Sequence, residues 1–216
     1  MAITFSTGSI IAIASTYGAS KTMSAITNAA EAVATFEGGH GISVGDYFEV
    51  TSDWDRLNGR IVRAKVVATN DVTLEGIDTS NTTKYPTGTG TGTIREVTAW
   101  TNLSQIQTVE PGGGEIQYAD VTTIIDQVQK QIPTTRAAVT VSMTFFDDAT
   151  LGWYATVRSA SEAATATGVK FTFPNGSILV ANAYWSLQTT PSIGSNQPLT
   201  AKIDLSYAAE PVRYAS

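Results

Sequence analysis

Apolar and polar residues alternate with a period of two along three segments in the second half of the chain, residues 139–145, 179–188 and 201–207. In the first segment, every second side chain from Val139 to Phe145 is apolar, and Thr or Ser lies between them. Successive side chains of an extended strand point to opposite faces of a sheet, so this pattern predicts strands with one buried and one polar face. The three segments predict a mainly β fold.

A turn sequence separates two further apolar segments, residues 169–173 and 177–180. The turn is Pro174-Asn175-Gly176, in which proline fixes its own φ and Asn-Gly tolerates positive φ. We therefore expect a β-hairpin here.

One segment has helical rather than strand periodicity. Apolar residues recur at helical spacing from Trp153 onward, Asp147 or Asp148 offers an N-cap, and Gly168 offers a stop. The pattern predicts a single α-helix over about 148–167, flanking a β-sandwich or open barrel.

Residues 31–78 differ from the rest of the chain because they hold short apolar segments separated by closely spaced turns. The expected strands are 33–36, 47–51, 61–68 and 72–74. We interpret this stretch as a small inserted β-barrel module, so that residues 1–30 and 79–216 form one discontinuous domain. Residues 79–93 are rich in Thr and Gly and predict a flexible loop or linker.

The composition of the chain argues against several classes of function. The 216 residues include no cysteine, which excludes disulfides and thiolate metal sites, and their formal net charge is −6. A net negative charge disfavours a direct grip on nucleic acid, because phosphate binding depends on cationic neutralisation. The apolar run 10–13 follows no Lys or Arg, and no apolar segment approaches the ~20 residues of a membrane span, so we expect neither a signal peptide nor a membrane partner.

The residues that could carry chemistry form no catalytic or ligand-binding set. His40 is the single histidine and lies in a Gly-rich turn. Asp53-Trp54-Asp55 partly matches a calcium loop, but Ala64 stands where the bidentate Glu belongs. We expect a capped turn there, and we expect no catalytic residue, cofactor or metal.

Three other features have structural interpretations. Asp147 and Asp148, side by side before a helix, are typical of N-capping rather than of a catalytic pair. Gly112-Gly113-Gly114 is followed by no Lys-Ser or Lys-Thr and precedes a strand pattern, which disfavours a phosphate-binding loop. The tryptophans lie in apolar patterns, apart from Trp54, which lies in a turn.

The second half of the chain resembles the tail tube subunits of long-tailed, siphophage-like bacteriophages. The resemblance rests on Glu-Pro-Gly-Gly-Gly-Glu-Ile-Gln-Tyr-Ala-Asp at 110–120, Gln-Lys-Gln-Ile-Pro-Thr at 129–134, and Phe-Phe-Asp-Asp at 145–148. The closing strand at 199–207 and Glu-Pro-Val-Arg-Tyr at 210–214 extend it. It covers about residues 93–216, with 3–25 as a first hairpin.

A second resemblance falls inside the expected insert. Gly-His-Gly-Ile-Ser-Val-Gly-Asp-Tyr at 39–47, with Leu-Asn-Gly at 57–59 and Val-Thr-Leu at 72–74, is similar to a short β module of phage tail and fibre proteins.

The tail tube resemblance implies a non-enzymatic virion protein, assembled in the host cytoplasm, whose hexameric rings stack into a tube for DNA ejection. It implies contacts with other copies of the chain and with the tape measure, tail terminator or distal tail proteins. Double-stranded DNA would pass through the lumen without specific binding.

Residues 115–129 have no purely apolar and no purely polar face. A strand that serves both a subunit core and a shared barrel would have this pattern, as would an irregular loop. DNA slides best past acidic or amide side chains, so we expect Glu115, Asp120 and Asp126 to face the lumen.

Most of the negative charge lies in the expected insert, which holds nine acidic and four basic residues. Six such modules would repel one another near the tube axis, whereas farther out they are separated by more than the ~8 Å Debye length. We therefore expect residues 31–78 to project from the outside of the tube, as a decoration that the tube does not require.

The alternative function is a carbohydrate-binding or adhesin-like β-sandwich, which would use the tryptophans and the polar loop. Such a module would stay monomeric. A hydrolase is a third possibility, but one histidine and scattered carboxylates provide no catalytic set.

Overall fold

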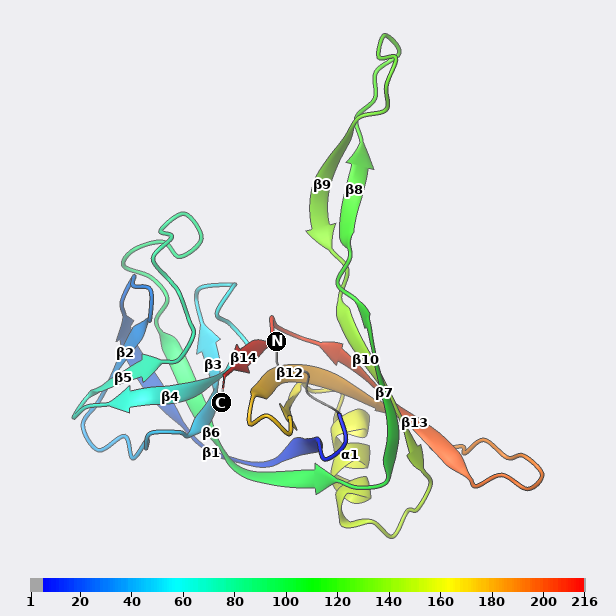
Figure 1. Ribbon diagram of the computed structural model, residues 1–216. Helices are drawn as coiled ribbons and strands as arrows, with labels where there is room; N and C mark the ends of the chain where they lie inside the picture. The colour runs from blue at the N-terminus through cyan, green and yellow to red at the C-terminus, as the bar shows by residue number, and fades with distance from the viewer. Residues whose placement is uncertain (1–5, 216) are drawn as a thin grey trace.

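The computed structural model describes residues 6–215, which form two β bodies and a long projecting hairpin (Figure 1). The strands lie in the order β1 (Ile10–Ile26), β2 (Val33–Phe36), β3 (Tyr47–Ser52), β4 (Ile61–Val67), β5 (Asp71–Leu74), β6 (Gly92–Leu103), β7 (Ile106–Gly113), β8 (Ile116–Asp120), β9 (Gln131–Arg136), β10 (Val139–Phe146), β11 (Thr167–Thr172), β12 (Ile178–Leu187), β13 (Thr200–Tyr207) and β14 (Val212–Tyr214). One helix, α1 (Gly152–Ala163), lies between β10 and β11. The mainly β prediction is confirmed.

One antiparallel sheet of twelve strands runs through both bodies in the order β2-β5-β4-β3-β6-β1-β11-β12-β13-β10-β7. Its twelfth strand, β14, pairs with β12, and β8 and β9 form a separate two-stranded sheet. The long strands β1 and β6 belong to both bodies, because their outer ends pair with β2 and β3 and the inner part of β1 pairs with β11. A 17-residue strand, rather than the expected hairpin at 3–25, occupies this part of the chain; residues 1–5 lie outside the described range.

The first body is a closed barrel of six strands. The four short strands predicted from the sequence form as β2, β3, β4 and β5, and the pairing of β1 with β2 closes the circle through β6. The four strands of residues 31–78 thus enclose their core only together with the ends of β1 and β6. Their apolar cluster also includes Val180, Val212 and Tyr214 from the other body.

Trp54 fills one end of this barrel. Its ring is buried and meets Tyr85 edge to face at 5.2 Å between ring centroids. Its Nε1 donates to Pro86 O at 3.0 Å and to Thr89 Oγ1 at 2.9 Å, so the turn residue without a role in the sequence pattern anchors the loop after β5. The prediction of a flexible linker at 79–93 is wrong, because Tyr85 and these hydrogen bonds fix the loop to the barrel.

The second body is a curved sheet of β1, β11, β12, β13, β10 and β7, with helix α1 packed against its apolar face (Figure 1). The alternation predicted for residues 139–145 and 201–207 is confirmed, since Val141, Met143 and Phe145 are buried and their neighbours are not. Phe145 meets Trp153 of α1 edge to face at 5.1 Å. The helix therefore seals one side of an open β-barrel core.

The helix is shorter than the predicted 148–167. Asp148 accepts hydrogen bonds from the backbone N and Oγ1 of Thr150, so it stabilises a turn before the helix instead of capping it. At the other end, Ala164 adopts φ 50° and ends the helix. Gly168 is not the stop: it lies in β11, where a Cβ would come 2.6 Å from Ile61 Cδ1.

The hairpin predicted at Pro174-Asn175-Gly176 joins β11 to β12. Phe173 N donates to Ser177 O at 2.9 Å, and Gly176 has φ 80°. The Asn-Gly signal was therefore sufficient to locate this turn.

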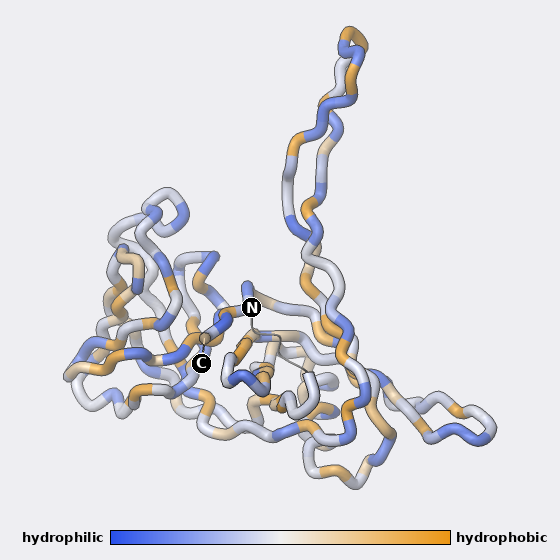
Figure 2. Tube along the Cα trace, viewed as in Figure 1, coloured by the Kyte–Doolittle hydropathy of each residue, from blue (hydrophilic) through white to orange (hydrophobic). Residues whose placement is uncertain are grey.

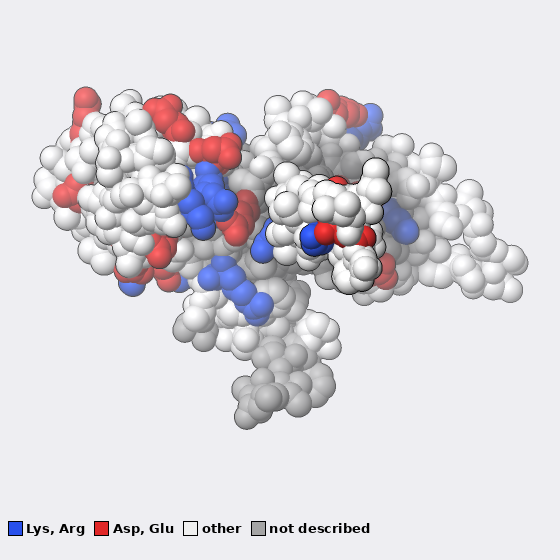
Figure 3. All heavy atoms as spheres, turned by 90° about the horizontal axis from the view of Figure 1, so that it is seen from above, with Lys and Arg blue, Asp and Glu red and all other residues white. Residues whose placement is uncertain are grey.

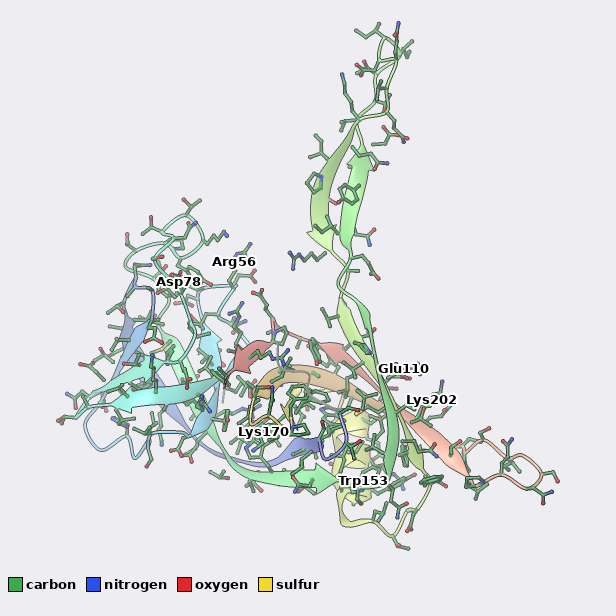
Figure 4. All side chains as sticks on the ribbon, viewed as in Figure 1. Arg56, Asp78, Glu110, Trp153, Lys170 and Lys202 are labelled. Atoms are coloured by element: carbon green, nitrogen blue, oxygen red, sulfur yellow. The ribbon has the colours of Figure 1, made fainter. Side chains whose placement is uncertain are left out.

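The two bodies meet through polar and aromatic contacts as well as apolar ones. Glu49 of β3 accepts from Asn182 Nδ2 of β12 at 3.0 Å, and Tyr214 Oη of β14 accepts from the backbone N of Arg63 at 2.8 Å. Lys170 of β11 lies between the bodies, with its Nζ 4.5 Å from the Trp100 ring (Figure 4). Burial at this joint lowers the pKa of Lys170.

Candidate assembly surfaces

The most exposed element of the molecule is the ribbon that rises from β7 and β10 and continues as β8 and β9 (Figure 1). Between its two halves, Gly113 has φ 70°, and a Cβ there would lie 2.0 Å from Ala138 O. Only glycine fits this position, because an L side chain at that φ is strained and would collide with the opposite strand. The glycine run at 112–114 thus joins the β7–β10 part of the ribbon to its β8–β9 part.

Two aspartate carboxylates stabilise the tip of the hairpin, residues 121–130, by accepting hydrogen bonds. Asp120 Oδ1 accepts from the backbone N and Oγ1 of Thr122, and Asp126 Oδ2 accepts in the same way from Thr123. Asp126 also pairs with Lys130. The hydrogen bond from Thr122 lowers the pKa of Asp120, and that from Lys130 lowers the pKa of Asp126.

Apolar side chains at this tip have nothing to pack on within the described chain. Ile124 is fully exposed, and Ile125 and Val128 are 90% and 74% exposed. Figure 2 shows apolar positions between hydrophilic ones along the whole hairpin, up to its tip. Exposed apolar clusters of this kind mark interaction surfaces on soluble proteins.

The three carboxylates predicted to face the lumen, Glu115, Asp120 and Asp126, all lie on this hairpin, away from the subunit core. Glu115 and Asp120 are exposed, and Asp126 is half-buried. The single strand suggested for residues 115–129 does not form, since β8 ends at Asp120 and the tip follows. The mixed pattern arises because a two-stranded ribbon in solvent has no core face.

A second surface is the polar face of β7, β10, β13 and β12, on the side of the sheet opposite helix α1. Its side chains are mainly Ser and Thr, with Glu110, Asp204 and Lys202 as charged groups. Figure 4 shows Glu110 and Lys202 near the base of the hairpin. The strict alternation of β10 and β13 marked this face as polar, and no sequence signal assigned it a role.

Strand β7 is the last strand of the sheet, so one of its backbone edges has no partner strand in the described chain. An apolar groove of about 760 Å³ opens beside it, lined among others by Ile11, Ile106, Phe171 and Leu179. An unpaired edge next to apolar surface favours association with a further chain.

The remaining candidates have structural roles. His40 Nδ1 accepts from Ile42 N at 3.1 Å, and Asp53 Oδ2 accepts from Thr91 Oγ1 at 3.1 Å. Within residues 6–215, no group of three or more His, Asp or Glu side chains is placed to hold a metal ion, and no helix is long and apolar enough to span a membrane.

The tryptophans do not form the platform that a carbohydrate-binding module needs. Trp54, Trp153 and Trp185 are buried, and Trp100 packs against Tyr47 at the joint between the two bodies. Stacking on a sugar ring requires an exposed aromatic face, which these four residues do not offer.

The family model described as "Phage tail tube protein, TTP" matches residues 52–216. The chain belongs to the phage tail tube protein family. This tail tube protein is therefore a structural component of the virion tail and not an enzyme. The match begins in the barrel, well before the resemblance that the sequence displays from residue 93.

Among solved structures, the tail tube protein is similar to a chain from the "tail of empty GTA particle computed with helical refinement, C6 symmetry". The two are 9% identical with a TM-score of 0.42, and the similarity covers 54% of this chain and 87% of that one. No curated protein matches the chain.

Proposed function

We propose that this tail tube protein assembles into hexameric rings that stack into a tube, and that the tube conducts DNA into the host. The projecting hairpin is the observation that carries the proposal. A two-stranded ribbon is marginally stable alone in water, and this one exposes Ile124, Ile125 and Val128 at its tip. Contact with another subunit would bury these side chains and stabilise the ribbon.

Ring closure is supported by the free edge of β7. Pairing of this edge with a neighbouring copy, repeated around a ring, satisfies its backbone groups and leaves no open strand. Six copies per ring is the number that the tail tube resemblance implies.

For the lumen, the proposal keeps Glu115, Asp120 and Asp126 as candidates and adds the polar sheet face with Glu110 and Asp204. Because the chain has no cysteine, one can be introduced at a single position. In assembled tubes with both ends blocked, a cysteine in the lumen should resist a membrane-impermeant maleimide that labels the ring-free subunit. Labelling of all these positions in the tube would contradict the assignment.

The partners inferred from the family resemblance are further copies of the chain, a tape measure protein in the growing lumen, and tail terminator or distal tail proteins at the tube ends. Assembly in the host cytoplasm and passage of DNA without specific binding belong to the same proposal. A net charge of −6 supports weak contact with DNA.

The domain division is also proposed: residues 1–30 and 79–216 as the tube domain, and residues 31–78 as a barrel module at the outer radius. An epitope coupled to a cysteine introduced at Val66, an exposed residue of β4, should appear at the outer wall in micrographs. Density for the epitope inside the tube would contradict this placement.

Electron microscopy of the purified protein tests the proposal directly. We expect rings or tubes with a central channel, and analytical ultracentrifugation should show assembly from the subunit as concentration rises. A monomer that persists at high concentration, with no rings in micrographs, would rule out the tube function and favour a monomeric binding module.

A further inference from the structure

A groove of about 900 Å³ lies between the barrel and the base of the hairpin, and basic side chains gather around it. Arg56 and Lys84 come from barrel loops and Arg136 from the end of β9, while Ala208 to Pro211 border it on the chain after β13. Seen from above, blue side chains lie between the barrel and the hairpin tip, with red ones beside them (Figure 3). Three of the 13 Lys and Arg side chains of the chain thus border one groove.

These three cations have no carboxylate partner. Seven of the other Lys and Arg side chains make ion pairs, whereas among residues 6–215 no acidic group lies within 4.0 Å of Arg56, Lys84 or Arg136. The one carboxylate that lines the groove, Glu210, is paired with Arg60. All three cations are exposed, so their charges remain available to a partner.

The acidic residues near this end of the barrel either accept hydrogen bonds from other side chains or lie outside the groove. Asp78 accepts from Ser80 N and Oγ, and Asp53 accepts from Thr91. Asp55 does not line the groove. Arg56 and Asp78 are both visible at the upper end of the barrel in Figure 4.

Acidic side chains lie in the loops at the opposite end of the barrel. This end is formed by the loop from β2 to β3, residues 37–46, and by the loop from β4 to β5, which ends at Asp71. These loops carry Glu37, Asp46 and Asp71 and no Lys or Arg, and Lys21 of β1, which is paired with Glu96, lies beside them. In Figure 1 these loops lie at the lower left of the barrel, whereas the hairpin and the loop 79–91 point upward.

A basic groove beside one end of the barrel and acidic loops at the other end suit a head-to-tail contact. In a stack of rings that all face the same way, the upper surface of one subunit meets the lower surface of the next, which is a heterologous contact. We propose that the basic groove of Arg56, Lys84 and Arg136 receives the acidic 37–46 and 68–71 loops of a second copy of this chain in the next ring. The inference rests on the proposed tube function and gives the barrel a role in ring stacking.

This assignment modifies the expectation that the barrel is dispensable. At the outer radius, barrels in successive rings would form columns along the tube, with one such contact per subunit at each ring junction. Each exposed ion pair contributes little by itself, but repetition around a ring makes the sum large. The contact also fixes one rotational register between rings, because each groove matches one set of loops.

The test is charge reversal at the groove with rescue at the loops. Relative to the parent chain, R56E/K84E should form rings normally and raise the critical concentration for tubes on the order of tenfold at low salt. The effect should shrink in about 0.5 M salt, where screening weakens exposed pairs. Adding E37K to R56E/K84E should restore part of the stacking, since Glu37 makes no side-chain hydrogen bond or ion pair in the described chain.

The matched control is K65E/R158E, which changes net charge equally at two exposed positions that do not line the groove. It should stack like the parent chain. Equal stacking by R56E/K84E and the parent, or equal loss in the control, would overturn the inference while leaving the tube function intact. Absence of rings from the parent chain would instead contradict the tube function. If R56E/K84E does not fold, the milder R56A/K84A is measured in its place.

Discussion

Asn182 on β12 donates its side-chain Nδ2 to Glu49 Oε1 on β3 at 3.0 Å, across the joint between the barrel and the curved sheet. Glu49 Oε2 is bound by Arg95 of β6, so one carboxylate connects three strands. Asn182 is buried, and its other side-chain atom, Oδ1, has no hydrogen-bond partner. The joint is therefore sensitive to loss of any one of these groups.

We expect Glu49→Ala to lower the free energy of unfolding by about 1–3 kcal/mol, because Arg95 loses its carboxylate and the buried amide of Asn182 loses its acceptor. Urea denaturation followed by fluorescence measures the change. Glu162→Ala is the control, since its pair with Arg158 is exposed, and it should cost less than about 0.5 kcal/mol. Equal losses in both variants would contradict a special role for the joint.

Gly113→Ala should disrupt the base of the hairpin and prevent tube formation while the two bodies remain folded. The added Cβ would lie 2.0 Å from Ala138 O, at a residue with φ 70°. Micrographs and near-ultraviolet circular dichroism report the two properties separately. Gly152→Ala, where the new Cβ meets nothing within 4 Å, should assemble normally. Normal tubes from Gly113→Ala would show that tube formation does not require a glycine at this position.

Ile124→Ser combined with Ile125→Ser should leave subunit stability within about 0.5 kcal/mol, because surface changes without partners have small effects. The same variant should assemble poorly if the tip docks on another copy. Light scattering gives the assembly yield. Val66→Ser, which also replaces an exposed apolar residue but on the barrel, should assemble as the parent does. Full assembly by the tip variant would exclude the tip from the contact.

Trp54→Ala should cost about 3–5 kcal/mol, as expected when a fully packed aromatic side chain is removed. Trp54→Phe retains much of the ring but loses the hydrogen bonds to Pro86 O and Thr89 Oγ1, so it should lose less. Limited proteolysis within residues 79–91 should speed up in both variants. An unchanged cleavage rate in Trp54→Ala would show that the loop does not depend on this residue.

Acid should loosen the hairpin tip. Asp120 and Asp126 have pKa values below their ordinary range in the folded chain. Their contribution to the stability of the tip is therefore complete above the pKa of an aspartate in the unfolded chain, about 3.9. It is lost as pH falls through the lower, folded values. Amide exchange at Thr122 and Thr123 should therefore accelerate, beyond its intrinsic pH dependence, below about pH 4. Constant protection down to pH 2 would contradict this role.

Period-two patterns and Asn-Gly turns were sufficient to predict most strands, because they reflect local chemistry and one buried face. The four barrel strands and the hairpin at residues 174–176 were predicted in this way. The sequence did not reveal that β1 and β6 complete the barrel, since strand pairing across a long separation leaves no local signal. It also left Trp54 unexplained, because the two oxygen atoms that accept from its Nε1, Pro86 O and Thr89 Oγ1, belong to a distant loop.

The assembly surfaces were only partly predictable. Residues 115–129 were recognised as having no core face, and Gly112-Gly113-Gly114 as unsuited to phosphate. The length of the hairpin and the gathering of Arg56, Lys84 and Arg136 could not be read from the sequence, because these residues come from three separate elements. A cation is known to be unpaired only when the positions of all neighbouring carboxylates are known, and the sequence does not give these positions.

The continuity of β1 and β6 through both bodies has a consequence for how the subunit folds. The barrel closes only when Met23 pairs with both Phe36 and Gly92, and the same two strands then enter the second body. Neither body has a complete set of strands without the other, so we expect them to unfold in one cooperative transition. Non-local pairing of this kind folds slowly, so we expect newly made chains to expose unpaired strands until β1 and β6 have found their partners.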